Sequence, residues 1–159
     1  MINIGSKQLK GISIGNRAVK EVYKGSQKIW AKESWINVSL TKKYFTISSS
    51  NHNTTEIISS ALNVSDVTKT TFRISGSFTG AGVLYYYDSS GVEQSLVGAQ
   101  SFNNLITYTT YKRIITVNYQ GNTIKISIND SKQLTVTYWK NNDSYSAVSL
   151  TINKIELLS

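Results

Sequence analysis

The pentapeptide Gly11-Ile12-Ser13-Ile14-Gly15 matches the G-x-S-x-G pattern that surrounds the nucleophilic serine of many hydrolases. That chemistry needs a sharp turn from a strand into a helix and a histidine base within reach of the serine. Here Ser13 lies in a repeated segment whose equivalent positions hold Asn3 and Tyr23. The single histidine, His52, lies in a polar stretch of the chain. We therefore expect no hydrolase site.

The sequence also lacks the residues that other kinds of active site need. Glycoside hydrolysis needs two carboxylates that flank the sugar, whereas Asp88 and Glu93 read as isolated acids in a turn. The chain has no cysteine, no cluster of histidines and carboxylates, and no glycine-rich loop ahead of a helix. The sequence predicts a protein that is not an enzyme and that binds no metal or cofactor.

Aromatic residues are the most prominent chemical feature, with ten Tyr and three Trp. If Val136 and Tyr138 point inward along a strand, Trp139 points outward and leads into the polar residues 140–145. A ring beside amides and a carboxylate suits a sugar, because it stacks on C–H groups while the polar groups bond hydroxyls. The predicted saccharide site consists of Trp139, Asn141, Asn142, Asp143, Tyr145 and Tyr86. Since aromatic residues also favour strands, Trp139 could instead cap the fold or lie in a subunit interface.

The elements that must position these residues are β-strands. Apolar and polar residues alternate along segments rich in β-branched and aromatic residues, with Ser, Asn and Gly turns between them. We expect strands over residues 35–40, 43–48, 70–78, 82–88, 112–119, 123–129, 133–139 and 147–158. Residues 49–69 could add another strand or one helical turn. This pattern predicts an all-β antiparallel sandwich, jelly-roll-like, with an immunoglobulin-like sandwich as second choice.

The first part of the chain repeats itself with a period of ten residues. Gly5, Gly15 and Gly25 are each followed by Ser or Asn and flanked by apolar residues, which is a hairpin signal. About 30 residues are fewer than the ~40 that an unaided domain usually needs. We therefore expect an attachment element over residues 1–33, followed by the sandwich over residues 34–159. Its predicted assembly residues are Ile2, Ile4, Leu9, Ile12, Ile14, Val19, Val22, Ile29 and Trp30. The alternative is a β-meander packed on its own sandwich.

Residues 14–30, IGNRAVKEVYKGSQKIW, carry a resemblance to a known group. The run resembles the opening of many tail, baseplate and fibre proteins of long-tailed phages that infect Gram-positive bacteria. The resemblance covers about 30 of the 159 residues. It implies a virion structural protein without implying which part of the particle it belongs to.

The end of the chain carries a second resemblance. Residues 149–157, SLTINKIEL, are similar to the closing strand of carbohydrate-binding-module jelly rolls, and the similarity extends loosely to residues 72–78 and 83–88. Many such jelly rolls hold a structural calcium ion through clustered acids. In this chain Asp66, Asp88, Asp130 and Asp143 are widely scattered, so a calcium site is not expected.

The charge and hydropathy of the sequence limit the kinds of partner that we expect. The net charge is +8, and residues 1–33 hold seven Lys or Arg against Glu21 and Glu33. No apolar run is long enough to cross a membrane or to serve as a signal peptide, so we expect no membrane partner and no export signal. A basic start is compatible with an anionic wall polymer, an acidic subunit or a solvated surface. Nucleic acid is the less favoured partner.

These observations combine into one functional expectation. The chain is expected to be a non-enzymatic phage virion protein, made in the host cytoplasm and located in the particle's tail, that attaches through its repeats and binds a host cell-wall saccharide through its sandwich. Its expected partners are other virion proteins and copies of itself, with a trimer as one arrangement, because repeated copies strengthen weak sugar binding. The alternative is a purely structural virion component or head-decoration protein with no saccharide ligand.

Overall fold

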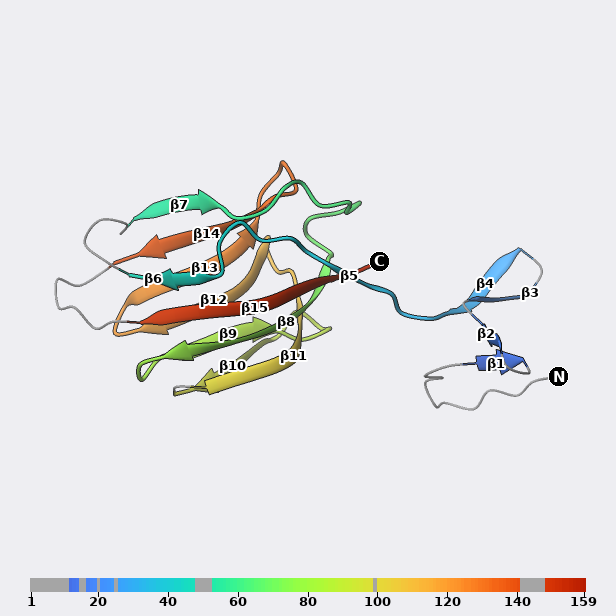
Figure 1. Cartoon of the computed structure of the whole chain (residues 1–159), viewed down its shortest axis with the longest axis horizontal. Helices are drawn as coiled ribbons and strands as arrows, with labels where there is room; N and C mark the ends of the chain where they lie inside the picture. The colour runs from blue at the N-terminus through green and yellow to red at the C-terminus, as the bar shows by residue number, and fades with distance from the viewer. Residues whose placement is uncertain are drawn as a thin grey trace. The chain divides into compact units, whose positions relative to one another are not determined.

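The computed structural model describes residues 12–14, 17–19, 21–24, 26–47, 53–98, 100–140 and 148–159 (Figure 1). The chain divides into two compact units, Met1–Ser34 and Trp35–Ser159, one residue from the predicted boundary. All regular structure in the described residues is β-strand, which confirms the predicted all-β class. These residues contain no helix that is long and apolar enough to span a membrane.

The first unit contains two short antiparallel hairpins. Strand β1 (Ile12–Ile14) pairs with β2 (Arg17–Val19), and β3 (Glu21–Lys24) pairs with β4 (Gln27–Ala31). Apolar positions of the repeat face each other across each pair, Ile12 opposite Val19 and Val22 opposite Trp30. The second and third predicted hairpins are therefore confirmed, while the first, over residues 2–11, lies outside the described residues.

The second unit is a sandwich of two antiparallel sheets. The six-stranded sheet has the order β10-β9-β12-β13-β14-β7. Its strands are β7 (Thr54–Ile57), β9 (Val83–Tyr87), β10 (Glu93–Val97), β12 (Arg113–Tyr119), β13 (Asn122–Ile128) and β14 (Leu134–Trp139). The five-stranded sheet has the order β11-β8-β15-β5, and β6 also pairs with β15. Its strands are β5 (Trp35–Asn37), β6 (Tyr44–Thr46), β8 (Thr71–Thr79), β11 (Gln100–Tyr108) and β15 (Ser149–Leu158).

The hydrophobic core lies between the two sheets, because alternate residues of each strand point to the same side. Phe72, Ile74 and Phe78 of β8 are buried, as are Ile124 and Ile126 of β13. Their neighbours in sequence lie on the outer faces. This alternation confirms the predicted sandwich.

The connections repeatedly cross between the sheets. Consecutive strands change sheet from β6 to β7, β7 to β8, β8 to β9, β10 to β11, β11 to β12 and β14 to β15. Strand β15 lies inside the five-stranded sheet, with β8 on one side and both β5 and β6 on the other. The two-sheet sandwich is established, and the choice between jelly roll and immunoglobulin-like topology stays a prediction.

Three strands of the sandwich were not predicted as such. The ambiguous residues 49–69 contribute β7, and β10 and β11 were missed entirely. A tight turn joins β12 to β13, and its residues Gln120 and Gly121 have φ angles of 48° and 80°. Two consecutive positive φ values are typical of the tight turns that suit the twist of hairpins.

The sandwich has two ends that differ in what they carry. Trp35, the first residue of this unit, pairs with Leu158 at one end. Trp139 pairs with Thr123 at the other end, where β14 stops (Figure 1). The loops at the Trp139 end are therefore remote from the point at which the chain enters the sandwich.

Candidate functional site

Trp139 occupies the position that the predicted saccharide site requires. Tyr138 is fully buried and Trp139, the next residue, is 54% exposed on the outer face of the six-stranded sheet. On the same face, the hydroxyl groups of Thr55 and Thr137 lie 3.0 Å apart in a hydrogen bond across β7 and β14. An exposed indole ring thus borders a row of hydroxyl groups.

The remaining residues of the predicted site do not join Trp139 in the described structure. Tyr86 is partly buried and packs against the core, and β12 and β13 separate its strand from that of Trp139. The other four, Asn141, Asn142, Asp143 and Tyr145, lie outside the described residues. Among the predicted assembly residues, Val19 and Val22 are partly buried. Ile2, Ile4 and Leu9, and the side chains of Ile12, Ile14, Ile29 and Trp30, lie outside the description.

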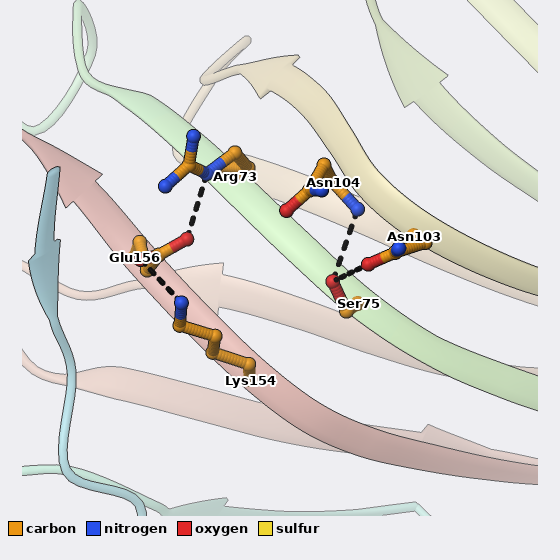
Figure 2. Close-up of polar contacts among 6 residues, drawn as sticks. All are labelled: Arg73, Ser75, Asn103, Asn104, Lys154 and Glu156. Carbon is orange, nitrogen blue, oxygen red and sulfur yellow. Dashed lines mark hydrogen bonds and ion pairs between the residues drawn. The ribbon is translucent and has the colours of Figure 1, made fainter. Parts of the chain in front are cut away.

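A second polar surface, which the sequence analysis did not predict, lies on the outer face of the five-stranded sheet (Figure 2). Its members are contributed by β8, β11 and β15 and form two neighbouring groups. Hydrogen bonds join Ser75 to Asn103 and Asn104, and ion pairs join Glu156 to Arg73 and Lys154. We call it the Ser75 patch; it consists of Arg73, Ser75, Asn103, Asn104, Lys154 and Glu156. At its centre the Ser75 hydroxyl donates to Asn103 Oδ1 at 2.9 Å and accepts from the Asn104 backbone N–H at 3.0 Å.

Irregular backbone on both sides of β8 shapes this patch. The register shifts in β11 between Phe102 and Leu105, and in β15 between Ile152 and Lys154. The inward-facing Gly76 lies between the two shifts, and a Cβ there would lie 2.1 Å from the carbonyl oxygen of Thr151. Extra residues at bulges bend a strand and redirect side chains, and bulges are common beside binding sites. Here the two bulges bring amide side chains to the level of Ser75.

Glu156 is the electrostatic centre of the patch. Its two carboxylate oxygens accept from Arg73 Nε at 2.7 Å and from Lys154 Nζ at 2.6 Å. The bond from Arg73 and then the bond from Lys154 lower the pKa of Glu156 from 4.5 to about 2. The Arg73 guanidinium also lies 4.5 Å from the centre of the Trp35 ring, in a cation–π contact. The carboxylate is therefore ionised and fixed in place at neutral pH.

The other acids act in turns and in pairs. Asp66 accepts from the Thr68 hydroxyl and N–H, and Asp88 accepts from the N–H groups of Ser90 and Val92. These hydrogen bonds lower the pKa of both aspartates. Asp130 pairs with Lys112, and Asp143 lies outside the described residues. Within the described ranges, no three His, Cys, Asp or Glu side chains cluster in a way that could hold a metal ion.

The sequence contains a local signal for the bulges beside Ser75, although not for the patch as a whole. The dipeptide Asn103-Asn104 interrupts the alternation of β11, and Asn104 adopts a positive φ of 53°, which asparagine tolerates better than most residues. Asn153 interrupts β15 in the same way. An amide inside an otherwise alternating strand indicates a bulge. It does not indicate which other strand, with its own bulge, lies nearby in the sheet.

Comparison with protein-family models, curated proteins and solved structures gave no match for this chain. The functional argument therefore depends on the residues and geometry described above.

Proposed function

We propose that this chain is a non-enzymatic bacteriophage virion protein that attaches through its N-terminal hairpins and binds a host-surface saccharide at the Trp139 end of its sandwich. The observations that carry the proposal are the division of the chain into two units and the position of Trp139 within the second unit. Short hairpins form their own unit, and the chain enters the sandwich at the end opposite Trp139. A surface used for adhesion should be accessible in the assembled particle, and Trp139 lies at the end of the sandwich opposite Trp35, the first residue of this unit.

The attachment role is supported by the small size of the hairpins. Strands β1 and β2 have three residues each, and β3 and β4 have four and five. Strands of this length bury little apolar surface, and isolated two-stranded hairpins are marginally stable in water. Such a unit gains stability when a partner covers its apolar positions, as an assembly contact would do.

The saccharide role is supported by the exposed ring of Trp139. Thr123 lies opposite it on β13, and Thr137, two residues earlier on the same face of β14, forms a hydroxyl pair with Thr55 of β7. These hydroxyl groups can bond sugar hydroxyls while the indole stacks on C–H groups. The positive net charge of the chain is compatible with an anionic wall polymer.

Binding of the full chain to purified cell walls of Gram-positive bacteria tests the saccharide role. We expect Trp139→Ala to weaken binding by about tenfold, since an aromatic stacking contact contributes about 0.5–1.5 kcal/mol. Tyr111→Ala is the matched control, because Tyr111 is 86% exposed but lies in the turn between β11 and β12, at the opposite end. Equal loss in both variants contradicts the proposal. No binding by the intact protein to any wall favours the purely structural alternative.

Incorporation into phage particles tests the attachment role. A chain that begins at Ser34 should fold and bind walls but fail to join the particle. If the shortened chain is incorporated as well as the full chain, the hairpins are not the attachment element.

A further inference from the structure

A cleft opens in the five-stranded sheet at the edge of the Ser75 patch. Strand β15 pairs with β5 through residues 156–158 and with β6 through residues 149–151. Between these pairings the chain from residue 38 to residue 43 leaves the sheet, and β15 carries its bulge at Asn153. The resulting space, which we call the Asn153 cleft, has a volume of about 330 Å³. This is at the lower end of the range of about 300–1,000 Å³ for small-molecule sites.

The walls of the Asn153 cleft are fixed by backbone hydrogen bonds. The Val38 N–H donates to the Ile155 carbonyl at 2.8 Å, and the Ile152 N–H donates to the Lys43 carbonyl at 2.8 Å. These bonds tie both ends of the 38–43 segment to β15, on either side of the bulge. The cleft is therefore preformed, and a ligand would not need to order its walls.

The chemistry of the lining is polar and positive. Asn37 and Asn153 provide amides, Ser39 provides a hydroxyl, and Lys43 and Lys154 provide ammonium groups. Among the described residues that line the cleft, none carries a carboxylate. The cleft therefore combines donors suited to sugar hydroxyls with two cations suited to an anionic group.

Lys154 retains its capacity to bind an anion. Its partner Glu156 is shared with Arg73, so two cations balance one carboxylate, and its side chain is 47% exposed. Lys43 adds a further positive charge on the other side of the cleft. Lys154 also belongs to the Ser75 patch, so the cleft borders the ion pairs of Glu156 (Figure 2).

We propose that the Asn153 cleft binds an anionic saccharide, with Lys43 and Lys154 engaging a phosphate or carboxylate group and the amides of Asn37 and Asn153 engaging hydroxyl groups. This site is distinct from the Trp139 surface, which lies on the other sheet. It depends only on the cleft and not on the assignment to a virion.

Titrations of the full chain, followed by amide chemical shifts in NMR spectra, test this site. The probes are glycerol 3-phosphate and glucuronate, with glucose as the neutral comparison. We expect an anionic probe to shift the amides of residues 37–43 and 153–154, and glucose to bind at least tenfold more weakly, since a hydrogen bond to a charged group contributes about 1.5–3 kcal/mol. A response to glycerol 3-phosphate alone assigns the site to phosphate-bearing glycans, and a response to glucuronate alone assigns it to acidic sugars.

Lys43→Gln is the decisive variant, because it removes one cation without disturbing the ion pairs of Glu156. We expect it to weaken binding of the anionic probe about tenfold, and Lys154→Gln to do the same. Lys125→Gln, on the outer face of the six-stranded sheet, is the control for general charge attraction and should leave binding unchanged. The proposal is overturned if neither anion shifts the cleft amides, if glucose binds as tightly, or if Lys125→Gln weakens binding as much as Lys43→Gln. Circular dichroism verifies that each variant is folded.

Discussion

Across β13, β14 and β7 the outer face of the six-stranded sheet has an unbroken register, whereas the outer face of the five-stranded sheet is interrupted by bulges in β11 and β15. The regular face carries threonine hydroxyls and the exposed Trp139. The irregular face carries an ion-pair network, the bulge residue Asn104 with its positive φ, and a cleft. The difference indicates that regular strands present a flat surface, while bulges are needed to gather several polar side chains around one point.

The largest expected effect comes from the glycine between the two bulges. Gly76→Ala should lower the free energy of unfolding by about 3 kcal/mol or more, because its Cβ would overlap the Thr151 carbonyl and the backbone must move. Gly82→Ala, just before β9, is the matched control. Its added Cβ would lie 3.2 Å from its nearest neighbour, the Asn118 carbonyl oxygen, so the substitution should cost about 1 kcal/mol. Urea unfolding measures both. Equal costs would contradict the close approach at Gly76.

A smaller effect is expected from a buried hydroxyl that joins the two sheets. The Thr107 hydroxyl donates to the Ile114 carbonyl at 2.8 Å and accepts from the Tyr87 N–H at 3.2 Å. Thr107→Val preserves the shape but leaves both backbone groups without this partner, so we expect a loss of about 2 kcal/mol. On the regular face, Thr135→Val removes only a 3.4 Å contact to the Ser127 carbonyl and should cost about 0.5 kcal/mol. If Thr135→Val and Thr107→Val lower the free energy of unfolding equally, the special role of the Thr107 hydroxyl is contradicted.

The ion pairs of the irregular face should make stability depend on acid pH. Because the pKa of Glu156 falls from 4.5 in the unfolded chain to about 2 in the fold, its contribution is fully present above about pH 4.5 and disappears as the pH falls towards 2. Glu156→Gln should therefore be less stable than the natural chain at pH 6, and the gap should close between pH 4.5 and 2. Thermal unfolding across this range measures the gap, and a gap that does not change with pH argues against the network.

The smallest effect concerns the turn between β11 and β12. Tyr111 and Lys112 have φ angles of 50° and 65°, in a turn closed by two backbone hydrogen bonds between Thr110 and Arg113. Such turns favour Asn-Gly. The double variant Tyr111→Asn, Lys112→Gly should raise the free energy of unfolding by about 1 kcal/mol, which urea titration detects. No gain would indicate that the turn is unstrained. The regular turn at Gln120-Gly121 already contains glycine and offers less to gain.

Sequence alternation predicted the regular parts of the fold well. Strands β8, β12, β13 and β14 lie within a residue or two of their predicted bounds, because each has one buried face and one exposed face. Strand β10 was missed because it is an edge strand that is exposed at nearly every position, so no alternation is visible. Strand β11 was missed because the bulge at Asn103-Asn104 interrupts its alternation and because one of its buried positions holds the polar Thr107. Strand β5 ends at Asn37, earlier than predicted, because the chain then turns towards the other sheet and Leu40 bridges Ser59.

The candidate sites also differ in how far they can be predicted from sequence alternation. Trp139 could be assigned to an outer face from the alternation of β14 alone. The Ser75 patch could not be predicted, because it depends on which bulges lie side by side, and that follows from the strand order β11-β8-β15. The local sequence indicates that Asn103 and Asn153 interrupt the alternation of their strands. Only the tertiary structure shows that these two strands, β11 and β15, flank the same strand, β8.

The most direct test of the account is an NMR titration of the full chain with soluble cell-wall polysaccharide fragments from a panel of Gram-positive bacteria. The account predicts that an active fragment shifts the Trp139 indole resonance and the amides of Thr123 and Thr137. If every fragment leaves the Trp139 end unchanged, or shifts only the turn at Tyr111 at the opposite end, the proposed adhesive surface is wrong.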